Sequence, residues 1–281
     1  MSGPLAGLRV LDLTRVLAGP FATAILADLG AEVVKLEPPS GDDYRAIGPF
    51  RDGESALFAL TNRGKRSVVV DLKAPEGQAL ARRMAAGCDV VVENFRPGVA
   101  ARLGLGAEAL RAENPGLVVC SISGFGQSGP DPALPAYDII VQALSGWMDA
   151  TGEAGGGPLK VGEALGDVAA GLYAAIGILA ALVGRGRTGE GAALDVAMLD
   201  CLVAMLPTSH ALHLYAGQSV ARVGNRHPLS TPFGGYLTAD GHVIIAVLGA
   251  RQFAALCRLV GRPEAADDPR FATDEGRTAH E

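Results

Sequence analysis

The chain has 281 residues, of which 49% are hydrophobic, 5% aromatic and 19% charged, and its formal net charge is −6. That length fits one large domain, or one domain and part of a second. The acidic balance disfavours general nucleic-acid binding, which calls for a basic surface. Any anionic ligand must therefore be held by local basic clusters and not by the overall field of the protein.

The N-terminal half alternates short apolar runs with helical patterns. Strands are expected at residues 8–13, 31–37, 65–72, 88–95 and 116–126, with helices between them. The runs are continuous Val, Ile and Leu, which is typical of parallel strands covered on both faces. We therefore expect a doubly wound α/β domain that binds its ligand outside the carboxyl ends of the strands. The loops that lie there are 14–20, 38–50, 72–75, 94–102 and 123–138.

Several classes of site are disfavoured. The first strand is followed by no G-x-G-x-x-G, and the chain has no Walker-type Gly-Lys-Ser/Thr, which counts against NAD- and ATP-dependent functions. The five histidines lack the spacing of a metal site. The cysteines are spaced for neither zinc nor disulfides and are expected to be buried free thiols. The start of the chain carries no signal-peptide pattern, so the expected location is the cytoplasm.

The stretch "ALGDVAAGLYAAIGILAALV" covers residues 164–183. No charged side chain occurs from Val168 to Gly184. A bilayer span needs about 20 apolar residues. Because this run is shorter and no second run follows, we interpret it as a buried helix and expect no membrane association. Asp167 stands at its front edge. This residue is either a helix N-cap or first-turn residue, or a carboxylate nucleophile kept ionised by the helix N-terminus.

Gly166, just before that carboxylate, would leave room for a bulky acyl group, and the N–H groups near it are candidate oxyanion donors. Basic residues also follow the expected strands. Each alone reads as a surface charge, but together they could hold a phosphorylated ligand: Lys65, Arg66, Lys73, Arg96 and Arg102.

Beyond 205 the pattern is less regular. A strand at 242–249 and a helix at 251–261 are expected after an irregular Gly- and Pro-rich stretch at 218–241, and the polar tail at 268–281 carries no packing signal. We divide the chain into a large domain at 1–205, a linker helix region at 206–221 and an incomplete smaller domain at 222–281.

Several segments together carry a resemblance. They are "GLRVLDLTRVLAGPFATAILADLGAEVVKLEPPSGD", "NRGKRSVVVDLKAPEG", "DVVVENFRPGVAARLG", "SISGFGQSGP", "YDIIVQALSG", "GEALGDVAAGLYAAIGILAAL" and "RTGEGAALDVAML". In this order they resemble the class III CoA-transferase family of the CaiB/BaiF type, which includes formyl-CoA transferase and the alpha-methylacyl-CoA racemases. The resemblance implies a Rossmann-like parallel sheet with helices on both faces, the start of a smaller α+β domain, and an interlocked homodimer.

The resemblance also implies the site. Asp167 matches the family's catalytic aspartate. Coenzyme A, which is part of the substrate and not a separate cofactor, would be contacted by Val16, Leu17, Ala18, Val70, Asp71, Leu72, Lys73, Asn94, Phe95, Arg96, Arg102, Leu103, Tyr137 and Asp138. The implied partners are an acyl-CoA and a carboxylic acid, and the implied reaction passes through a covalent aspartyl intermediate. Given such an acid, three arginines are candidates for binding the distal carboxylate of a dicarboxylic acid: Arg15, Arg45 and Arg226.

Two alternatives stay open beside CoA transfer. The racemases of the family carry a His immediately before the Asp of the "-DI-" segment, where this chain has Tyr137. A tyrosine with a pKa near 10 is a poor base for racemisation, so the resemblance favours transfer over 2-methylacyl-CoA racemisation. Family members usually continue well beyond the position of Glu281. A truncated, non-catalytic CoA-binding homologue is therefore the other alternative.

Overall fold

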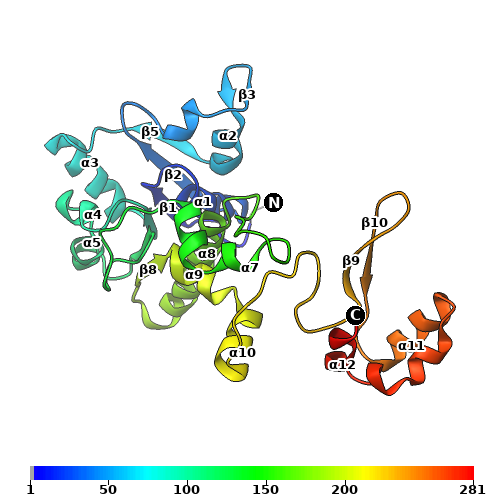
Figure 1. The fold of residues 1–281 in the computed structure, drawn as a ribbon. Coiled ribbons are helices and arrows are strands. Elements are labelled where there is room, and N and C mark those ends of the chain that lie inside the picture. The colour runs from blue at the N-terminus through cyan, green and yellow to red at the C-terminus, as the bar shows by residue number, and fades with distance from the viewer. Residues whose placement is uncertain (1–2) are drawn as a thin grey trace. The chain divides into compact units, whose positions relative to one another are not determined.

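The computed structural model describes residues 3–281, which form two compact units. The first unit comprises residues 3–147 and Val161–Pro207 (Figure 1). The second comprises Met148–Lys160 and Thr208–Glu281. The division expected from the sequence put residues 148–160 in the large domain, whereas the structure groups them with the C-terminal unit.

A six-stranded parallel sheet forms the centre of the first unit. Its order is β5-β2-β1-β6-β7-β8. The strands are β1 (Arg9–Asp12), β2 (Glu32–Glu37), β5 (Arg66–Val69), β6 (Val90–Glu93), β7 (Val118–Ser123) and β8 (Ala193–Ala197). The prediction of a parallel α/β sheet is confirmed. The strand order reverses between β1 and β6, and a crevice forms at such a switch point in doubly wound sheets.

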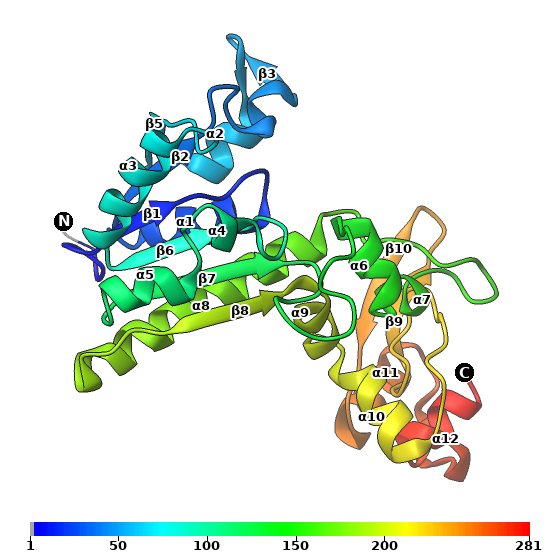
Figure 2. The same cartoon turned by 90° about the vertical axis from the view of Figure 1, so that its left-hand side faces the viewer.

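Helices cover both faces of this sheet (Figures 1 and 2). On one face lie α1 (Ala18–Asp28), α8 (Leu165–Thr188) and α9 (Met198–Ala204); on the other lie α3 (Pro75–Ala86) and α5 (Ala107–Glu113). Neighbouring strand residues enter opposite cores: Val10 packs with the first group and Leu11 with the second. Since side chains alternate across a strand, burial on both faces requires the continuous apolar runs seen in the sequence.

Among the described residues, α8 is the one helix long and apolar enough to cross a membrane by length and composition. One face of α8 is buried against α1 and the sheet. The opposite face exposes Leu172, Ile176 and Val183. The expected burial therefore holds for one face only. A side chain at Gly171 would lie 2.8 Å from the carbonyl oxygen of Ala18, so α1 and α8 cross in near backbone contact.

Shorter elements surround the carboxyl ends of the strands. After β2 come the 3-10 helix η1 (Asp43–Ala46), the strands β3 (Phe50–Arg51) and β4 (Glu54–Ser55), and α2 (Ala56–Asn62). After β6 comes α4 (Val99–Arg102), and after β7 comes α6 (Asp138–Leu144). The next helix in the chain, α7 (Trp147–Ala150), belongs mostly to the second unit. The region expected as a plain loop at 38–50 therefore contains the helix η1 and the start of the strand β3.

The C-terminal part of the chain continues through α10 (Pro207–Ala216), β9 (Phe233–Leu237), β10 (His242–Ala246), α11 (Ala250–Leu259), η2 (Pro263–Asp267), η3 (Pro269–Phe271) and α12 (Asp274–Ala279). β9 pairs antiparallel with β10. Two expectations are wrong here. Residues 218–241 are not irregular throughout, because β9 lies within them. The polar tail also packs: buried Arg277 donates to the carbonyl oxygens of Thr231 at 2.9 Å and Phe271 at 3.0 Å.

Candidate active site

A cavity of about 350 Å³ lies at the carboxyl ends of β1, β6 and β7, beside the switch point of the sheet. Asp167 is in its wall. Six of the predicted CoA contacts line the same cavity: Val16, Ala18, Asn94, Phe95, Arg96 and Tyr137. The cavity is near the lower end of the usual range for ligand pockets, about 300–1,000 Å³.

A second cavity, of about 500 Å³, lies beside the first. Arg15 and Phe95 line both cavities and therefore form the boundary between them. The predicted contacts in the second cavity are Val70, Asp71, Leu72, Lys73, Phe95 and Leu103. The other three predicted contacts line neither: Leu17 is the N-cap of α1, Arg102 ends α4, and Asp138 begins α6.

Asp167 is the third residue of α8, whose N-cap is Ala164. The N-cap interpretation of Asp167 is thus wrong, and its first-turn placement is right. The backbone N–H of Ala18, the first residue of α1, donates a hydrogen bond to the Asp167 carboxylate. Unpaired N–H groups and the helix dipole make a helix N-terminus favourable for an anion. Asp167 lies where the N-terminus of α1 meets the N-terminus of α8.

The pKa of Asp167 is raised from 3.8 to about 6. Burial is the main cause, and the nearby Asp138 carboxylate adds to it, while the hydrogen bond from Ala18 acts in the opposite direction. The carboxylate is ionised at neutral pH and more basic than an ordinary aspartate. Such a combination of burial and a specific charged neighbour in a cavity is typical of functional groups.

Asp138 holds the start of α8 in place. Its Oδ1 accepts the Gly166 N–H at 2.7 Å, and its Oδ2 accepts Gln142 Nε2, also at 2.7 Å. Buried Gln142 in turn accepts the Val161 N–H at 2.8 Å and donates to the Glu163 carbonyl oxygen at 3.1 Å. The segment that leads into α8 is therefore fixed by one amide side chain on α6.

These contacts bear on both expectations about Gly166. Its own N–H is engaged with Asp138 and is no oxyanion donor in this geometry, while the expectation for the other N–H groups near it stays a prediction. A side chain at this position would lie 2.7 Å from Val141 Cγ2. The glycine is needed for close packing against α6, and the room that the sequence suggested for an acyl group does not exist there.

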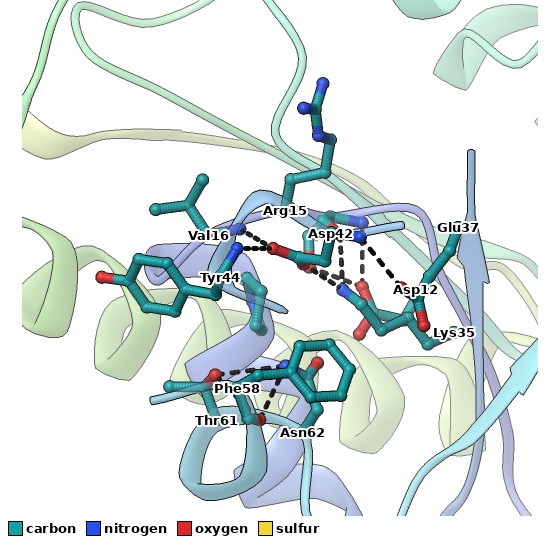
Figure 3. A network of polar contacts seen from close by, with 12 residues as sticks. Asp12, Arg15, Val16, Lys35, Glu37, Asp42, Tyr44, Phe58, Thr61 and Asn62 are labelled. Atoms are coloured by element: carbon teal, nitrogen blue, oxygen red, sulfur yellow. Dashed lines mark hydrogen bonds and ion pairs between the residues drawn. The ribbon is translucent and has the colours of Figure 1, made fainter. Parts of the chain in front are cut away.

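The loop between β1 and α1 is held from two sides, of which Figure 3 shows the side of Asp42. Val16 has a φ of 69°, a conformation that β-branched residues rarely adopt. Its N–H donates to Asp42 Oδ1 at 3.2 Å. On the other side, the Asn94 amide group pairs with both the N–H and the carbonyl oxygen of Arg15, at 2.9 and 2.8 Å. Backbone strain of this kind persists only where the surroundings enforce it, often at functional sites.

A buried ion network lies beneath this loop. Lys35 Nζ is 2.8 Å from Asp42 Oδ2, and Lys65 Nζ is 2.9 Å from Asp12 Oδ2. Although burial acts to raise the pKa of Asp12, the two lysines and hydrogen bonds from threonine hydroxyls lower it to about 2. Burial lowers the pKa of Lys65 to about 8. One signal of this network is visible in the sequence, namely the lysine in the middle of the otherwise apolar strand "EVVKLE".

Two of the basic residues expected to bind phosphate are engaged elsewhere. Lys65 is buried and also donates to the Pro20 carbonyl oxygen at 2.9 Å. Arg66 pairs with Glu32 at 2.8 Å on the surface. The structure therefore removes both from the candidate ligand contacts. Lys73 and Arg96, by contrast, line the second and the first cavity respectively.

The structure also separates the three candidate carboxylate-binding arginines. Arg45 makes two 2.7 Å hydrogen bonds to Glu37 and stacks on Phe58 at 3.7 Å. Arg226 belongs to the C-terminal unit and pairs with Glu281 at 2.8 Å. Of the three, Arg15 alone lines the cavity that contains Asp167. Within residues 3–281, no cluster of three or more His, Cys, Asp or Glu side chains could hold a metal ion.

The fold and site define a doubly wound α/β protein with a carboxylate of raised pKa in a cavity at the switch point of its sheet. The model of CoA-transferase family III matches residues 5–281. The chain belongs to this family and is a CoA-transferase.

Its relatives support that assignment. The chain is 48% identical to succinate–glutarate CoA-transferase of Agrobacterium fabrum, with 99% of this chain and 71% of that protein aligned. It is 47% identical to acetyl-CoA:oxalate CoA-transferase of Acetobacter aceti, over 99% of this chain and 72% of the relative. The crystal structure of a CaiB/BaiF family protein from Brucella suis matches all of this chain and 75% of its own, with 44% identity and a TM-score of 0.86.

Proposed function

We propose that this enzyme moves CoA from an acyl-CoA thioester to a carboxylic acid through a covalent intermediate on Asp167. The observation that carries the proposal is the placement of this carboxylate. It lines a cavity at the switch point of the sheet, accepts the Ala18 N–H at the start of α1, and has a pKa raised to about 6. A basic, poorly solvated carboxylate is suited to attack on an acyl carbon.

The reaction proceeds in two matched halves. An Asp167 oxygen attacks the thioester carbonyl carbon, the C–S bond breaks, and a mixed anhydride and CoA thiolate form. The thiolate attacks the aspartyl carbonyl carbon and releases the donor acid, leaving an aspartyl-CoA thioester. The acceptor carboxylate attacks this thioester and forms a new anhydride with release of thiolate. Attack of the thiolate on the acceptor's acyl carbon then yields the new acyl-CoA and regenerates Asp167.

The two cavities suit the two ends of CoA. We assign the thioester end to the cavity with Asp167 and the nucleotide end to the cavity with Lys73, joined past Phe95. The predicted contacts from the loops after β1, β5, β6 and β7 then follow one ligand along the carboxyl edge of the sheet. An ammonium group such as that of Lys73 pairs well with a phosphate.

The acids exchanged are assigned to the short dicarboxylic class. Succinate, glutarate and oxalate occur in the names of the relatives described above, and the first cavity is small. The chemistry of the aspartyl pathway needs no metal or redox cofactor, so we expect activity to withstand treatment with EDTA.

The experiment that tests the covalent pathway is trapping. The protein is incubated with succinyl-CoA, treated with hydroxylamine, digested and analysed by mass spectrometry. A hydroxamate is expected at Asp167 in the wild type and no modification in Asp167→Ala. A folded wild-type protein that exchanges CoA with no adduct at Asp167 overturns the proposal.

Two further measurements address the alternatives. Deuterium uptake at the α-carbon of a 2-methylacyl-CoA would show racemisation, and Tyr137 predicts that uptake is undetectable. A folded wild-type protein that binds CoA with no transfer to any acid would show a non-catalytic homologue.

We also propose a cytoplasmic homodimer. The first unit exposes apolar side chains that are costly to leave in water, including Leu172, Ile176 and Val183 on α8 and Val69 on β5. Light scattering coupled to size-exclusion chromatography is expected to give twice the chain mass of 28.7 kDa. A monomer at micromolar concentration contradicts this proposal and leaves the assignment of Asp167 untouched.

A further inference from the structure

Arg15 has an incompletely used guanidinium group. Its Nη2 lies 2.5 Å from Asp43 Oδ2. Its Nε is buried and, among the described residues, has no hydrogen-bond partner. Nε–H and one Nη2–H of an arginine point in parallel and form the fork that binds both oxygens of a carboxylate. In this structure, one prong of that fork is occupied and the other is buried and unsatisfied.

The backbone from which the Arg15 side chain extends is nevertheless fixed. The Asn94 amide clamps the Arg15 backbone on one side, and the strained Val16 follows it on the other. Figure 3 shows the Arg15 side chain directed away from the buried ion network. It therefore extends toward the two cavities that it lines, and the first of these contains Asp167.

Asp43 occupies the position that a carboxylate ligand would take. Asp43 lies in the wall of the same cavity, its side chain is 54% exposed, and Arg15 is its ion-pair partner. An exposed pair of this kind contributes little stability, about 0–1 kcal/mol. A ligand carboxylate that displaces Asp43 and accepts from both Nε and Nη2 would give Nε a hydrogen-bond partner. This exchange would be favourable because a buried donor without a partner costs free energy.

We propose that Arg15 binds the distal carboxylate of a dicarboxylic acid whose other carboxylate reacts at Asp167, and that Asp43 holds this arginine in place until the acid arrives. This inference rests on the proposed function and adds the residue that selects the acid. Diacids are chosen over monoacids of equal length because only a diacid fills the fork.

Arg15 also borders the second cavity, so a CoA phosphate is the competing ligand. The observations favour a carboxylate. Arg15 already pairs with a carboxylate, and its charge is balanced by Asp43, which would repel a dianionic phosphate. Lys73 lines the second cavity and supplies a positive charge there.

The test compares acceptors with one donor. Transfer from acetyl-CoA is measured to glutarate and to valerate, which have the same number of carbons, in the wild type and in Arg15→Gln. The expected result is a fall of about 10- to 100-fold in the glutarate-to-valerate ratio of kcat/KM, as for loss of a hydrogen-bonded charge pair. Arg15→Lys is expected to restore only part of the ratio, because lysine keeps the charge and lacks the fork.

A second variant, Asp43→Asn, tests the role of the residue that pairs with Arg15. Removal of the competing carboxylate is expected to lower the KM for glutarate severalfold while the KM for valerate changes less. Arg96→Gln is the matched control, since Arg96 lines the same cavity and is assigned to CoA. It is expected to raise the KM for acetyl-CoA with both acceptors alike and to leave their ratio unchanged.

The outcomes separate the two levels of inference. If Arg15→Gln raises the KM for acetyl-CoA equally with both acids and leaves the ratio unchanged, Arg15 binds CoA and the proposal is overturned. A wild type that transfers CoA with no preference for glutarate also overturns it, while the proposed function stands. A wild type with no transfer to any acid overturns the proposed function itself.

Discussion

The backbone N–H of Ala18 donates to the Asp167 carboxylate, and this bond joins the first residue of α1 to the first turn of α8. The contact is possible because Gly171, one turn further along α8, has no side chain to keep the helices apart. Asp167 is therefore positioned mainly by backbone. The electrostatic balance at this carboxylate leads to several measurable consequences.

The first consequence concerns the pH dependence of transfer. The attacking form of Asp167 is the carboxylate, and its pKa is about 6. We expect log kcat/KM to be flat above pH 7 and to fall with a slope of one below about pH 6. Steady-state rates in buffers of constant ionic strength check this. A limb near pH 4, the value of an unperturbed aspartate, would contradict the burial seen here.

The second prediction separates the two causes of that pKa. Asp138→Asn removes a negative charge that raises the pKa of Asp167, so the acidic limb is expected to move to lower pH. The rate at neutral pH is also expected to fall. Asp138 accepts hydrogen bonds from Gly166 and Gln142 on two different oxygens, whereas an asparagine side chain has one oxygen. Glu163→Gln is the control, since it removes an exposed charge in the neighbouring segment. A limb that moves equally in both variants would point to general charge effects.

The third prediction concerns stability. The pKa of Asp167 is higher in the folded state than the value of 3.8 that describes the unfolded chain. Between these values the folded state binds more protons, so its stability falls as pH rises from about 4 to about 6 and stays lower above. Asp167→Asn removes this penalty. At pH 7.5 we expect it to be more stable than the wild type by about 1–3 kcal/mol, given partial exposure of the group.

Thermal melts at two pH values test this effect. The advantage of Asp167→Asn should disappear towards pH 4, where the wild-type carboxyl is protonated in the folded state. An advantage of equal size at both pH values would mean that the substitution acts through packing. No advantage at either pH would mean that the carboxylate is well solvated.

The fourth prediction compares the contributions of two adjacent residues, Lys65 and Arg66, to the free energy of unfolding. Lys65→Met leaves Asp12 buried with less compensation, and loss of one partner of a buried pair typically costs about 3–5 kcal/mol. Arg66→Met breaks an exposed pair with Glu32 and should cost about 0–1 kcal/mol. Urea unfolding of both variants, followed by circular dichroism, gives the comparison. Similar midpoints for the two variants would argue that the network contributes little.

The fifth prediction concerns the loop before α1. Val16→Gly relieves a left-handed backbone conformation that costs an L-residue about 1–2 kcal/mol, but it also loosens the loop that presents Ala18 to Asp167. We expect a melting temperature close to that of the wild type and a lower kcat. Val16→Ala keeps the strain and should stay nearer to the wild-type kcat. Equal rates in both variants would show that the loop has no positioning role.

Most of the sheet could be predicted from the sequence because five of its strands centre on short runs of Val, Ile and Leu. The strand β8 (Ala193–Ala197) carries a weaker signal, since Asp195 interrupts it. The strand β9 could not, since Phe233–Leu237 contains two glycines and lies between prolines and a polar turn. The packing of the polar tail was also hidden: it depends on one buried arginine, Arg277, whose charge suggests an exposed position.

The site shows the same division. Asp167 stood out because one carboxylate precedes a long uncharged run. The space expected at Gly166 does not exist, because Val141 of α6 packs against this glycine, and Asp138, distant in sequence, occupies its N–H. Lys65 looked like a ligand-binding residue for a similar reason: its partner Asp12 comes 53 residues earlier. Local pattern identifies the reactive group, whereas the partners of polar groups depend on the tertiary fold.

The close crossing of α1 and α8 at Gly171 has an implication for how such enzymes diversify. Asp167, the proposed nucleophile, lies on a helix that crosses α1 with no space for a side chain at Gly171, while Asp43 and Tyr137 reach the same cavity from other segments. Arg15 belongs to the loop that leads directly into α1, so it cannot be varied without regard to that crossing. Under the proposed function, a designer who wishes to change the acid can begin with the segments around Asp43 and Tyr137 and leave the helical crossing intact.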